Sequence, residues 1–442
     1  MELKQKYNNF PFNPSKVPFF YGWVILFAAT VGVLCSAPGQ TTGVSTFTDY
    51  LIDSIGISRD QISTAYMFGT IASSFILTYA GKLYDKYGTR WVGMAAALML
   101  GFVLVLFSQS DRIIKAIVPQ SSNSYVGVSV ATCIVFFFML RFSGQGVITM
   151  VSRNMLMKWF IARRGLVNGI SSVFVSLGFS IAPLSFDLLI VETSWRWAWL
   201  LMALGIGVGF FLFVFIFFRD NPEDCDQIPD GEKHGNKERD VIIKPFKQFT
   251  LKEARSGLTF WLFVLPSAIY AMFITGYVFH LVSVFGEAGI DKEHALSVFI
   301  PMSMISVVLA FLGGWISDRI KLQYLLYFML AGMVVALIAL ANINTGFYYY
   351  TFIIGSAIPS GMYNVLLSVT WPRFYGREHL GKITGFVMAI IVFFSALGPI
   401  FFSLSHSHLG SYSYAIYALL AIILVISAIS FKAHNPQDRF EK

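Results

Sequence analysis

Three ionisable side chains, Arg141, Asp187 and His280, stand inside long apolar stretches, where a charge is costly unless it serves a function. The guanidinium of Arg141 can bind a carboxylate through two parallel hydrogen bonds. Gln145 follows four residues later, so it shares the same helical face. Asp187 and His280 carry groups that can take up and release protons. These residues predict recognition of a small anion, with Asp187 and His280 as candidates for proton coupling.

Each of the three residues also has a structural alternative. Arg141 could brace the first helix by binding its backbone carbonyl groups. His280 could be a buried histidine with a fixed hydrogen bond, and Asp187 stands near enough to the end of its stretch to be solvated.

Other polar and aromatic side chains could line the same kind of site. Tyr66, Tyr277 and Tyr363 each offer a ring together with a hydroxyl group, and Asn364 lies on a stripe of small polar residues at steps of four. We interpret these four residues as substrate-binding candidates. The alternative is ordinary packing, since small hydroxyl groups and tyrosines also serve contacts between membrane helices.

The composition identifies the class of protein that must position these residues. The 442 residues are 56% hydrophobic and only 13% charged, with a mean hydropathy of +0.66, which excludes a soluble domain. The net charge of +8 does not indicate nucleic-acid binding, because the basic residues stand in short segments between apolar runs, where they set topology and can contact anionic lipid. Cys35, Cys133 and Cys225 do not form a disulfide framework.

Apolar runs of membrane-spanning length predict an all-α membrane protein with twelve transmembrane helices. Placing both termini in the cytoplasm puts 26 of the 32 lysines and arginines on that side. A polar, charged linker at 219–258 separates an N-terminal bundle at 1–218 from a C-terminal bundle at 259–442. The expected helices are 20–46, 61–82, 91–109, 125–150, 166–190, 196–218, 259–285, 293–316, 321–342, 346–370, 381–403 and 412–432.

A short charged stretch between the second and third helices has the pattern G-x-L-x-D-x-x-G-x-R, from Gly81 through Asp85 and Gly88 to Arg90. Gly81 allows close helix approach, Gly88 permits a turn with positive φ, and Asp85 can accept hydrogen bonds from the start of another helix. We predict that Asp85 approaches the helix start at 381–384. The alternative is a solvated turn whose charges only set topology.

The two halves of the sequence repeat this and other features. Gly81-x-x-x-Asp85 corresponds to Gly314-x-x-x-Asp318, which Arg319 follows. Gly146 and Gly361 each stand thirteen residues before an aromatic residue, and Gly169 and Gly385 each stand fourteen before a proline. The repeats indicate a duplicated six-helix unit. By the same correspondence, Asp318 is predicted to bind the helix start at 165–168. The expected conformational latch consists of Gly81, Asp85, Gly88, Arg90, Gly314, Asp318 and Arg319.

The sequence resembles the major facilitator superfamily over nearly its whole length. Within that superfamily it is most similar to the branch of monocarboxylate transporters and oxalate/formate antiporters. The matching segments are Tyr21-Gly22-Trp23, Pro38-Gly39-Gln40-Thr41, residues 141–146, Trp159-Phe160, Arg163-Arg164-Gly165 and residues 314–319.

The resemblance implies two six-helix bundles related by pseudo-two-fold symmetry. It also implies a monomeric secondary transporter in the plasma (inner) membrane, which moves a small organic anion by alternating access, with proton coupling or anion exchange. Members of this branch that carry small carboxylates commonly place a basic residue within helix 8 or helix 11. In this sequence the eighth expected helix, 293–316, has none before Arg319, which argues against a substrate with two negative charges.

Other functions remain open at this point. Gly178-x-x-x-Ala182-Pro183 and Gly398-Pro399 loosely resemble an antiporter motif, so a proton-driven efflux carrier for a larger apolar compound is the alternative. A membrane enzyme or a non-transporting sensor is less well supported, since no catalytic set or sizeable output domain is evident. We expect no cofactor and no metal site, because His406 and His408 lack further nearby ligands.

Overall fold

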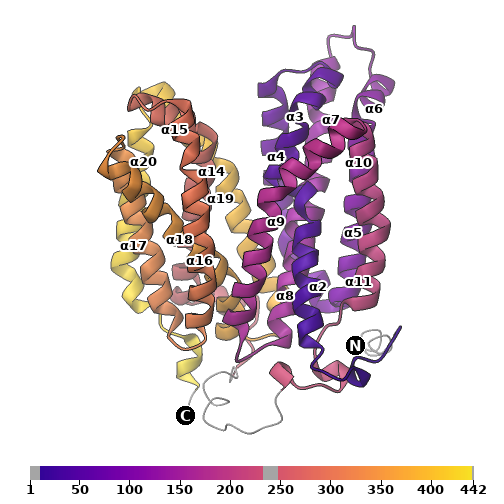
Figure 1. Cartoon of the computed structure of the whole chain (residues 1–442), viewed down its shortest axis with the longest axis vertical. Coiled ribbons are helices and arrows are strands. Elements are labelled where there is room, and N and C mark those ends of the chain that lie inside the picture. The colour runs from indigo at the N-terminus through magenta and orange to yellow at the C-terminus, as the bar shows by residue number, and fades with distance from the viewer. Residues whose placement is uncertain (1–9, 232–246, 441–442) are drawn as a thin grey trace. The chain divides into compact units, whose positions relative to one another are not determined.

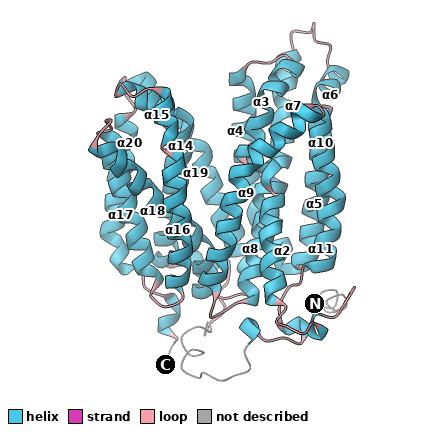
Figure 2. Ribbon diagram, in the orientation of Figure 1, coloured by secondary structure: helices cyan, strands magenta, loops and turns pink. Residues whose placement is uncertain are grey.

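The computed structural model describes residues 10–231 and 247–440, and every regular element within those two ranges is helical (Figures 1 and 2). Ten helical stretches in these ranges are long and apolar enough to cross a membrane. They comprise α5 (Thr89–Ser108), α7 (Tyr125–Leu140) with α8 (Thr149–Trp159), α9 (Arg164–Glu192), α10 (Trp195–Leu204) with α11 (Phe211–Phe217), α14 (Leu258–Glu287), α15 (Lys292–Ser297) with α16 (Phe299–Ser317), α17 (Leu322–Ala341), α18 (Phe347–Phe374), α19 (Leu380–Leu409) and α20 (Ser413–Ile429).

The two other predicted spans are also helical but depart from the simple pattern. The first is divided into α2 (Gly22–Cys35) and α3 (Thr41–Ile55), because Pro38 lacks the N–H that a continuous helix needs. The second, α4 (Arg59–Tyr87), is 29 residues long and carries several hydroxyl and charged side chains. All twelve predicted spans are therefore helical, and the all-α membrane fold is confirmed.

The described residues form two compact units. Unit 1 is drawn from Met1–Trp159, Phe174–Lys233 and Thr384–Ala389, and unit 2 from Phe160–Val173, His234–Ile383 and Ile390–Lys442. The first turns of α9 thus belong to unit 2, and a short part of α19 belongs to unit 1. The division into two six-helix bundles at 1–218 and 259–442 stays a prediction, and residues 232–246 of the expected linker lie outside the described ranges.

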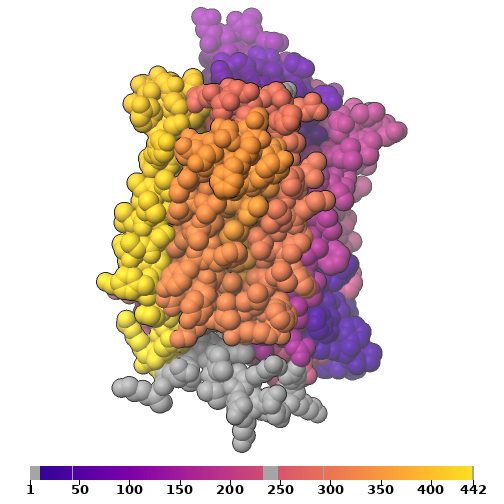
Figure 3. Space-filling view, turned by 60° about the vertical axis from the view of Figure 1, so that its left-hand side comes forward, coloured from indigo at the N-terminus to yellow at the C-terminus, as the bar shows by residue number. Residues whose placement is uncertain are grey.

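Helices in both units pack through small residues, which let backbones approach closely in a membrane. In unit 1, a Cβ placed on Gly101 of α5 would lie 2.6 Å from the Cα of Gly207. In unit 2, a Cβ on Gly355 of α18 would lie 2.8 Å from the backbone nitrogen of Ala336 in α17. Helix α17 packs against both α18 and α20, on the face shown in Figure 3.

Glutamine side chains tie both described ends of the expected linker to their units. Gln227 accepts a hydrogen bond from the backbone N–H of Tyr21 (3.1 Å) and donates to the carbonyl of Pro14 (3.2 Å). Gln437 accepts from the N–H of Lys247 (3.0 Å) and donates to its carbonyl (2.9 Å). In each unit a glutamine that follows the unit's last membrane helix therefore holds the segment that leads into the unit's first helix.

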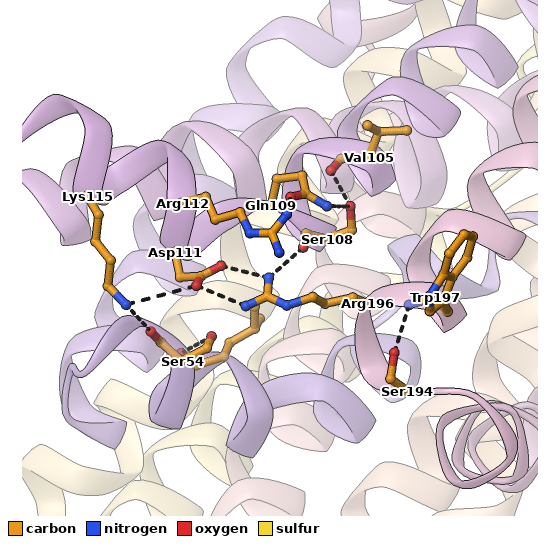
Figure 4. Close-up of polar contacts among 11 residues, drawn as sticks. Ser54, Val105, Ser108, Gln109, Asp111, Arg112, Lys115, Ser194, Arg196 and Trp197 are labelled. Carbon is orange, nitrogen blue, oxygen red and sulfur yellow. Dashed lines mark hydrogen bonds and ion pairs between the residues drawn. The ribbon is translucent and has the colours of Figure 1, made fainter.

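A clamp on the predicted outer side of unit 1 holds the short helix α6 (Ser110–Ile117) against α10 (Figure 4). Arg196 binds Asp111 through two hydrogen bonds of 2.7 and 2.9 Å, and it also donates to the carbonyl of Ser108 (2.8 Å). Lys115 reaches the carbonyl of Ser54 at the end of α3 (3.4 Å). The segment between α5 and α7 is thus fixed to two neighbouring helices.

The clamp predicts a pH-dependent stability. Partial burial raises the pKa of Asp111, but the hydrogen bonds and the charge of Arg196 outweigh that effect, so the pKa is lowered from its ordinary value. A carboxylate with a lowered pKa stabilises the folded state above its unfolded-state pKa of about 4, and it loses this contribution as the pH falls through the folded-state pKa. Arg196→Ala should therefore cost about 1–3 kcal/mol at neutral pH, and this cost should shrink in acid, as measured by thermal unfolding.

The exposed pair Arg59–Asp49 provides the control, because its side chains are 68% and 71% exposed. Arg59→Ala should cost no more than about 1 kcal/mol. Equal costs for the two substitutions, or a cost for Arg196→Ala that does not depend on pH, would contradict the proposed role of the clamp.

Candidate functional site

The break between α2 and α3 exposes backbone groups inside unit 1. Residues Ala37–Gly39 form a single tight turn, and Gln40 has an extended backbone with φ −87° and ψ 160°. Non-helical backbone at membrane depth needs partners from other helices, because lipid offers no hydrogen bonds. The carbonyl groups of this turn are therefore available to side chains on the neighbouring helix.

That neighbour is a π-helical segment, Arg141–Ile148, between α7 and α8. A Cβ on Gly39 would lie 2.8 Å from the Cα of Gly144, and a Cβ on Gly144 would lie 2.8 Å from the Cα of Gly39. Both positions therefore require glycine for this packing. π-Helical turns are rare and occur frequently at functional sites.

Arg141 lies where the helix break meets the π-helical segment, and its side chain is only 3% exposed. Its Nη1 donates to the carbonyl of Gly39 (3.1 Å) and lies 3.5 Å from the hydroxyl of Thr41. The guanidinium carbon stands 5.3 Å from the ring centre of Tyr66, and the Tyr66 hydroxyl is 2.8 Å from that of Thr41. Arg141 and Tyr66, both substrate-binding candidates, are thus brought together, and the contact with Gly39 is the bracing contact considered above.

Some hydrogen-bonding atoms of this site have no partner. Among the described residues, Nε of Arg141 and Oε1 of Gln145 are buried atoms without a hydrogen-bond partner. No carboxylate in the described ranges lies within ion-pair distance of Arg141. Thr149 instead binds the hydroxyl of Ser36 (3.2 Å), so it supports the helix break.

The other three substrate-binding candidates belong to unit 2. Tyr277 is fully buried, and its hydroxyl lies 3.4 Å from the sulfur of Met302, which places it in the packed core. The ring of Tyr363 stands 5.1 Å from that of Tyr270. The backbone carbonyl of Asn364 accepts a hydrogen bond from Asn168 at 3.4 Å. The burial of Tyr277 favours the packing alternative for that residue.

The two coupling candidates have different surroundings. Asp187 is exposed on α9 and makes no ion pair or hydrogen bond with the described residues. His280 is half-buried, and its Nε2 lies 3.0 Å from the carbonyl of Pro399. Its Nδ1 lies 3.5 Å from the hydroxyl of Tyr412. His280 therefore has the fixed hydrogen bond of its structural alternative.

In unit 2, the carboxylate of Asp318 occupies the start of α9, the contact predicted from the repeat. Its two oxygens accept hydrogen bonds from the backbone N–H groups of Gly165 (2.8 Å) and Leu166 (2.9 Å). A Cβ on Gly165 would lie only 1.9 Å from the carbonyl oxygen of Gly314, so the glycines allow the close approach. Arg319 lies apart from this contact, with its guanidinium 3.8 Å from the ring centre of Trp315.

The corresponding stretch of unit 1 has the expected backbone. Gly88 has φ +87° and ends α4. A Cβ on Gly385 of α19 would lie 2.6 Å from the carbonyl of Leu77 and 3.3 Å from the Cα of Gly81. Arg90 is buried and donates to the carbonyl of Phe218 (3.2 Å). Asp85 is half-buried in the last turn of α4, and its approach to residues 381–384 stays a prediction.

Two contacts near these stretches were missed from the sequence. Asp220 accepts hydrogen bonds from the backbone N–H (2.8 Å) and the hydroxyl (2.7 Å) of Thr89, and Lys158 lies 3.7 Å away. Arg373 pairs with Asp318 at 3.3 Å. The repeat contained a signal for the two cations, since Lys158 and Arg373 each precede the aromatic residue of a matched pair.

Comparisons with known proteins agree with this arrangement. The model of the Major Facilitator Superfamily matches residues 28–373. MFS-type transporter 1 of Ophiocordyceps sp. (strain BCC 1869) is 27% identical over 187 residues, which are 41% of this chain and 37% of that protein. The chain thus matches well under half of that relative's length.

Solved structures share the fold at low sequence identity. The proton:xylose symporter XylE superposes with a TM-score of 0.66 at 14% identity, covering 96% of this chain and 99% of that one. The E. coli fucose:proton symporter FucP gives 0.62 at 14%, with 96% and 97% covered. The human organic anion transporter MFSD10 gives 0.62 at 13%, with 92% and 99% covered.

These identities establish the fold and leave the substrate open. With the family match extending over more than half of its length, the chain belongs to the Major Facilitator Superfamily and is a multi-pass membrane transporter.

Proposed function

We propose that this transporter moves a small organic anion with a single carboxylate, by alternating access, coupled to protons or to exchange of another anion. The observation that carries the proposal is the unused edge of the Arg141 guanidinium. Nη1 is engaged by Gly39, whereas Nε is a buried atom without a hydrogen-bond partner among the described residues. A carboxylate can bind such an edge through two parallel hydrogen bonds.

Electrostatics supports the same choice of substrate. Arg141 is a buried cation at membrane depth, without a carboxylate partner in the described ranges, and such a charge is costly to leave uncompensated. An anionic substrate would neutralise it. The neutral acceptor Oε1 of Gln145 adds no second cation to the site, which fits one carboxylate better than two. We further propose that both termini face the cytoplasm at the plasma membrane, as the distribution of basic residues predicts.

A ligand screen by thermal unfolding tests this function. Purified protein would be heated with acetate, pyruvate, succinate, amino acids and an apolar drug. A ligand at one hundred times its dissociation constant stabilises the folded state by about 2.7 kcal/mol. We expect monocarboxylates to raise the unfolding temperature, and Arg141→Gln to remove that shift. Arg112→Gln, at an exposed arginine of α6, should retain it. Stabilisation by the apolar drug alone would favour the efflux alternative and overturn the proposal.

A further inference from the structure

Helices α14 and α19 of unit 2 approach each other closely at one pair of glycines. A Cβ on Gly398 would lie 2.3 Å from the carbonyl of Met272, and a Cβ on Gly276 would lie 3.0 Å from the carbonyl of Gly398. The residue after Gly398 is Pro399, inside α19. The two backbones therefore meet where the hydrogen-bond ladder of α19 is interrupted.

The interruption leaves one carbonyl without its helical partner. In a continuous helix, the N–H of residue 399 would donate to the carbonyl of Ser395, but proline has no N–H. The hydroxyl of Thr275 on α14 lies 2.7 Å from that carbonyl. A backbone carbonyl left without a donor between packed helices is costly.

The Thr275 hydroxyl has two competing acceptors in its own helix, because it also lies 2.7 Å from the carbonyl of Ala271 and 3.2 Å from that of Met272. Both carbonyls can already accept from the helical N–H groups of residues 275 and 276. The carbonyl of Ser395 has no such helical partner. Donation of the Thr275 hydroxyl hydrogen to Ser395 therefore stabilises the fold more than donation within α14. Thr275 therefore completes the hydrogen bonding of a neighbouring helix.

His280 makes a second contact five residues further along α14. Its Nε2 lies 3.0 Å from the carbonyl of Pro399. A carbonyl only accepts, so Nε2 must carry the hydrogen. Nδ1 lies 3.5 Å from the hydroxyl of Tyr412.

We propose that Thr275 and His280 are positioning residues for α19 around Pro399, and that they hold α14 and α19 together as one body at this level of the bundle. The contacts lie on either side of the Gly276–Gly398 crossing, so sliding or rotation of one helix against the other would break both. This role gives the Nε2 of His280 a fixed donor function. It does not depend on the nature of the substrate.

A double-mutant cycle tests the role of Thr275. Thr275→Val keeps the shape but removes the donor, and we expect it to lower the unfolding temperature clearly in the wild-type background. In the Pro399→Ala background, residue 399 again has an N–H for the carbonyl of Ser395, so Thr275→Val should cost little. The cycle isolates the hydrogen bond, because lost packing would be equal in both backgrounds. Thr275→Ser should retain most of the stability. Equal losses in both backgrounds would overturn the proposal.

A spectroscopic measurement tests His280 in the unmutated chain. Nitrogen-15 NMR of histidine-labelled protein in lipid nanodiscs distinguishes the two neutral tautomers. We expect His280 to show a single Nε2–H tautomer, because the carbonyl of Pro399 holds the hydrogen there. The exposed His408 serves as the internal reference for an unconstrained ring. An Nδ1–H tautomer, or a mixture like that of His408, would show that His280 does not donate a hydrogen bond to the carbonyl of Pro399.

Discussion

Arg141→Gln is expected to abolish transport of a monocarboxylate almost completely while leaving a folded protein in the membrane. Glutamine can still donate one hydrogen bond to the carbonyl of Gly39, so the contact with the helix break can persist. It loses the positive charge and the Nε–Nη2 edge, and both are needed to hold a carboxylate. Uptake into proteoliposomes, with the protein amount checked by size-exclusion chromatography, measures the effect.

Arg141→Lys separates charge from geometry at the same position. Lysine keeps the positive charge but lacks the planar fork, so transport should fall substantially without vanishing. The exposed Arg112→Gln again serves as the matched control and should transport normally. Wild-type uptake by a stably folded Arg141→Gln protein would refute substrate binding by Arg141. If both Arg141 variants fold poorly, and ligand still raises the unfolding temperature of the folded fraction as in wild type, Arg141 serves only to brace the helix break at Gly39.

Asp318→Asn is expected to release the start of α9 from unit 2. The aspartate accepts from two backbone N–H groups and pairs with Arg373, and its side chain is only 10% exposed. A partly buried carboxylate at a helix start can contribute up to about 2 kcal/mol. Asparagine offers one acceptor and no charge. A loss of one or two kcal/mol corresponds to a roughly 5- to 30-fold larger equilibrium constant for opening of this contact.

Hydrogen exchange measured on the intact chain reports this opening directly. The amides of Gly165 and Leu166 should exchange faster in Asp318→Asn by roughly that factor, while those in the middle of α9 should be unchanged. Asp226→Asn, at an exposed aspartate that follows Cys225, is the control and should have no effect on these amides. Unchanged exchange at Gly165 and Leu166 in Asp318→Asn would rule out the latch. We expect Asp85→Asn to loosen residues 381–384 in the same way, as the repeat predicts.

The sequence by itself determined the membrane fold and the correspondence between its halves. Continuous apolar runs of about twenty residues favour helices, because every backbone group must be paired within the bilayer and a helix pairs them within one segment. The repeated Gly-x-x-x-Asp spacing predicted the contact of Asp318 with residues 165–168, and the positive φ of Gly88 followed from its place after a helix. The φ of Gly88 is a local feature, so residue type and spacing are enough to predict it. The contact of Asp318 joins residues 153 apart and was predicted from the repeat.

For the other contacts across helices, only the tertiary structure decided which partners meet. Arg141 and Gly39 are 102 residues apart, and Thr275 and Ser395 are 120 apart. Helical spacing identifies neighbours on one helix, but a partner on another helix depends on the depth and rotation at which the two helices cross. In a membrane that crossing is set by close packing of small residues, as at Gly39–Gly144 and Gly276–Gly398, and hydrophobic pattern does not encode it. The sequence therefore indicated Arg141 as a candidate, and the structure alone supplied the helix break, the unpaired Nε of Arg141 and the contacts of Thr275 and His280 with α19.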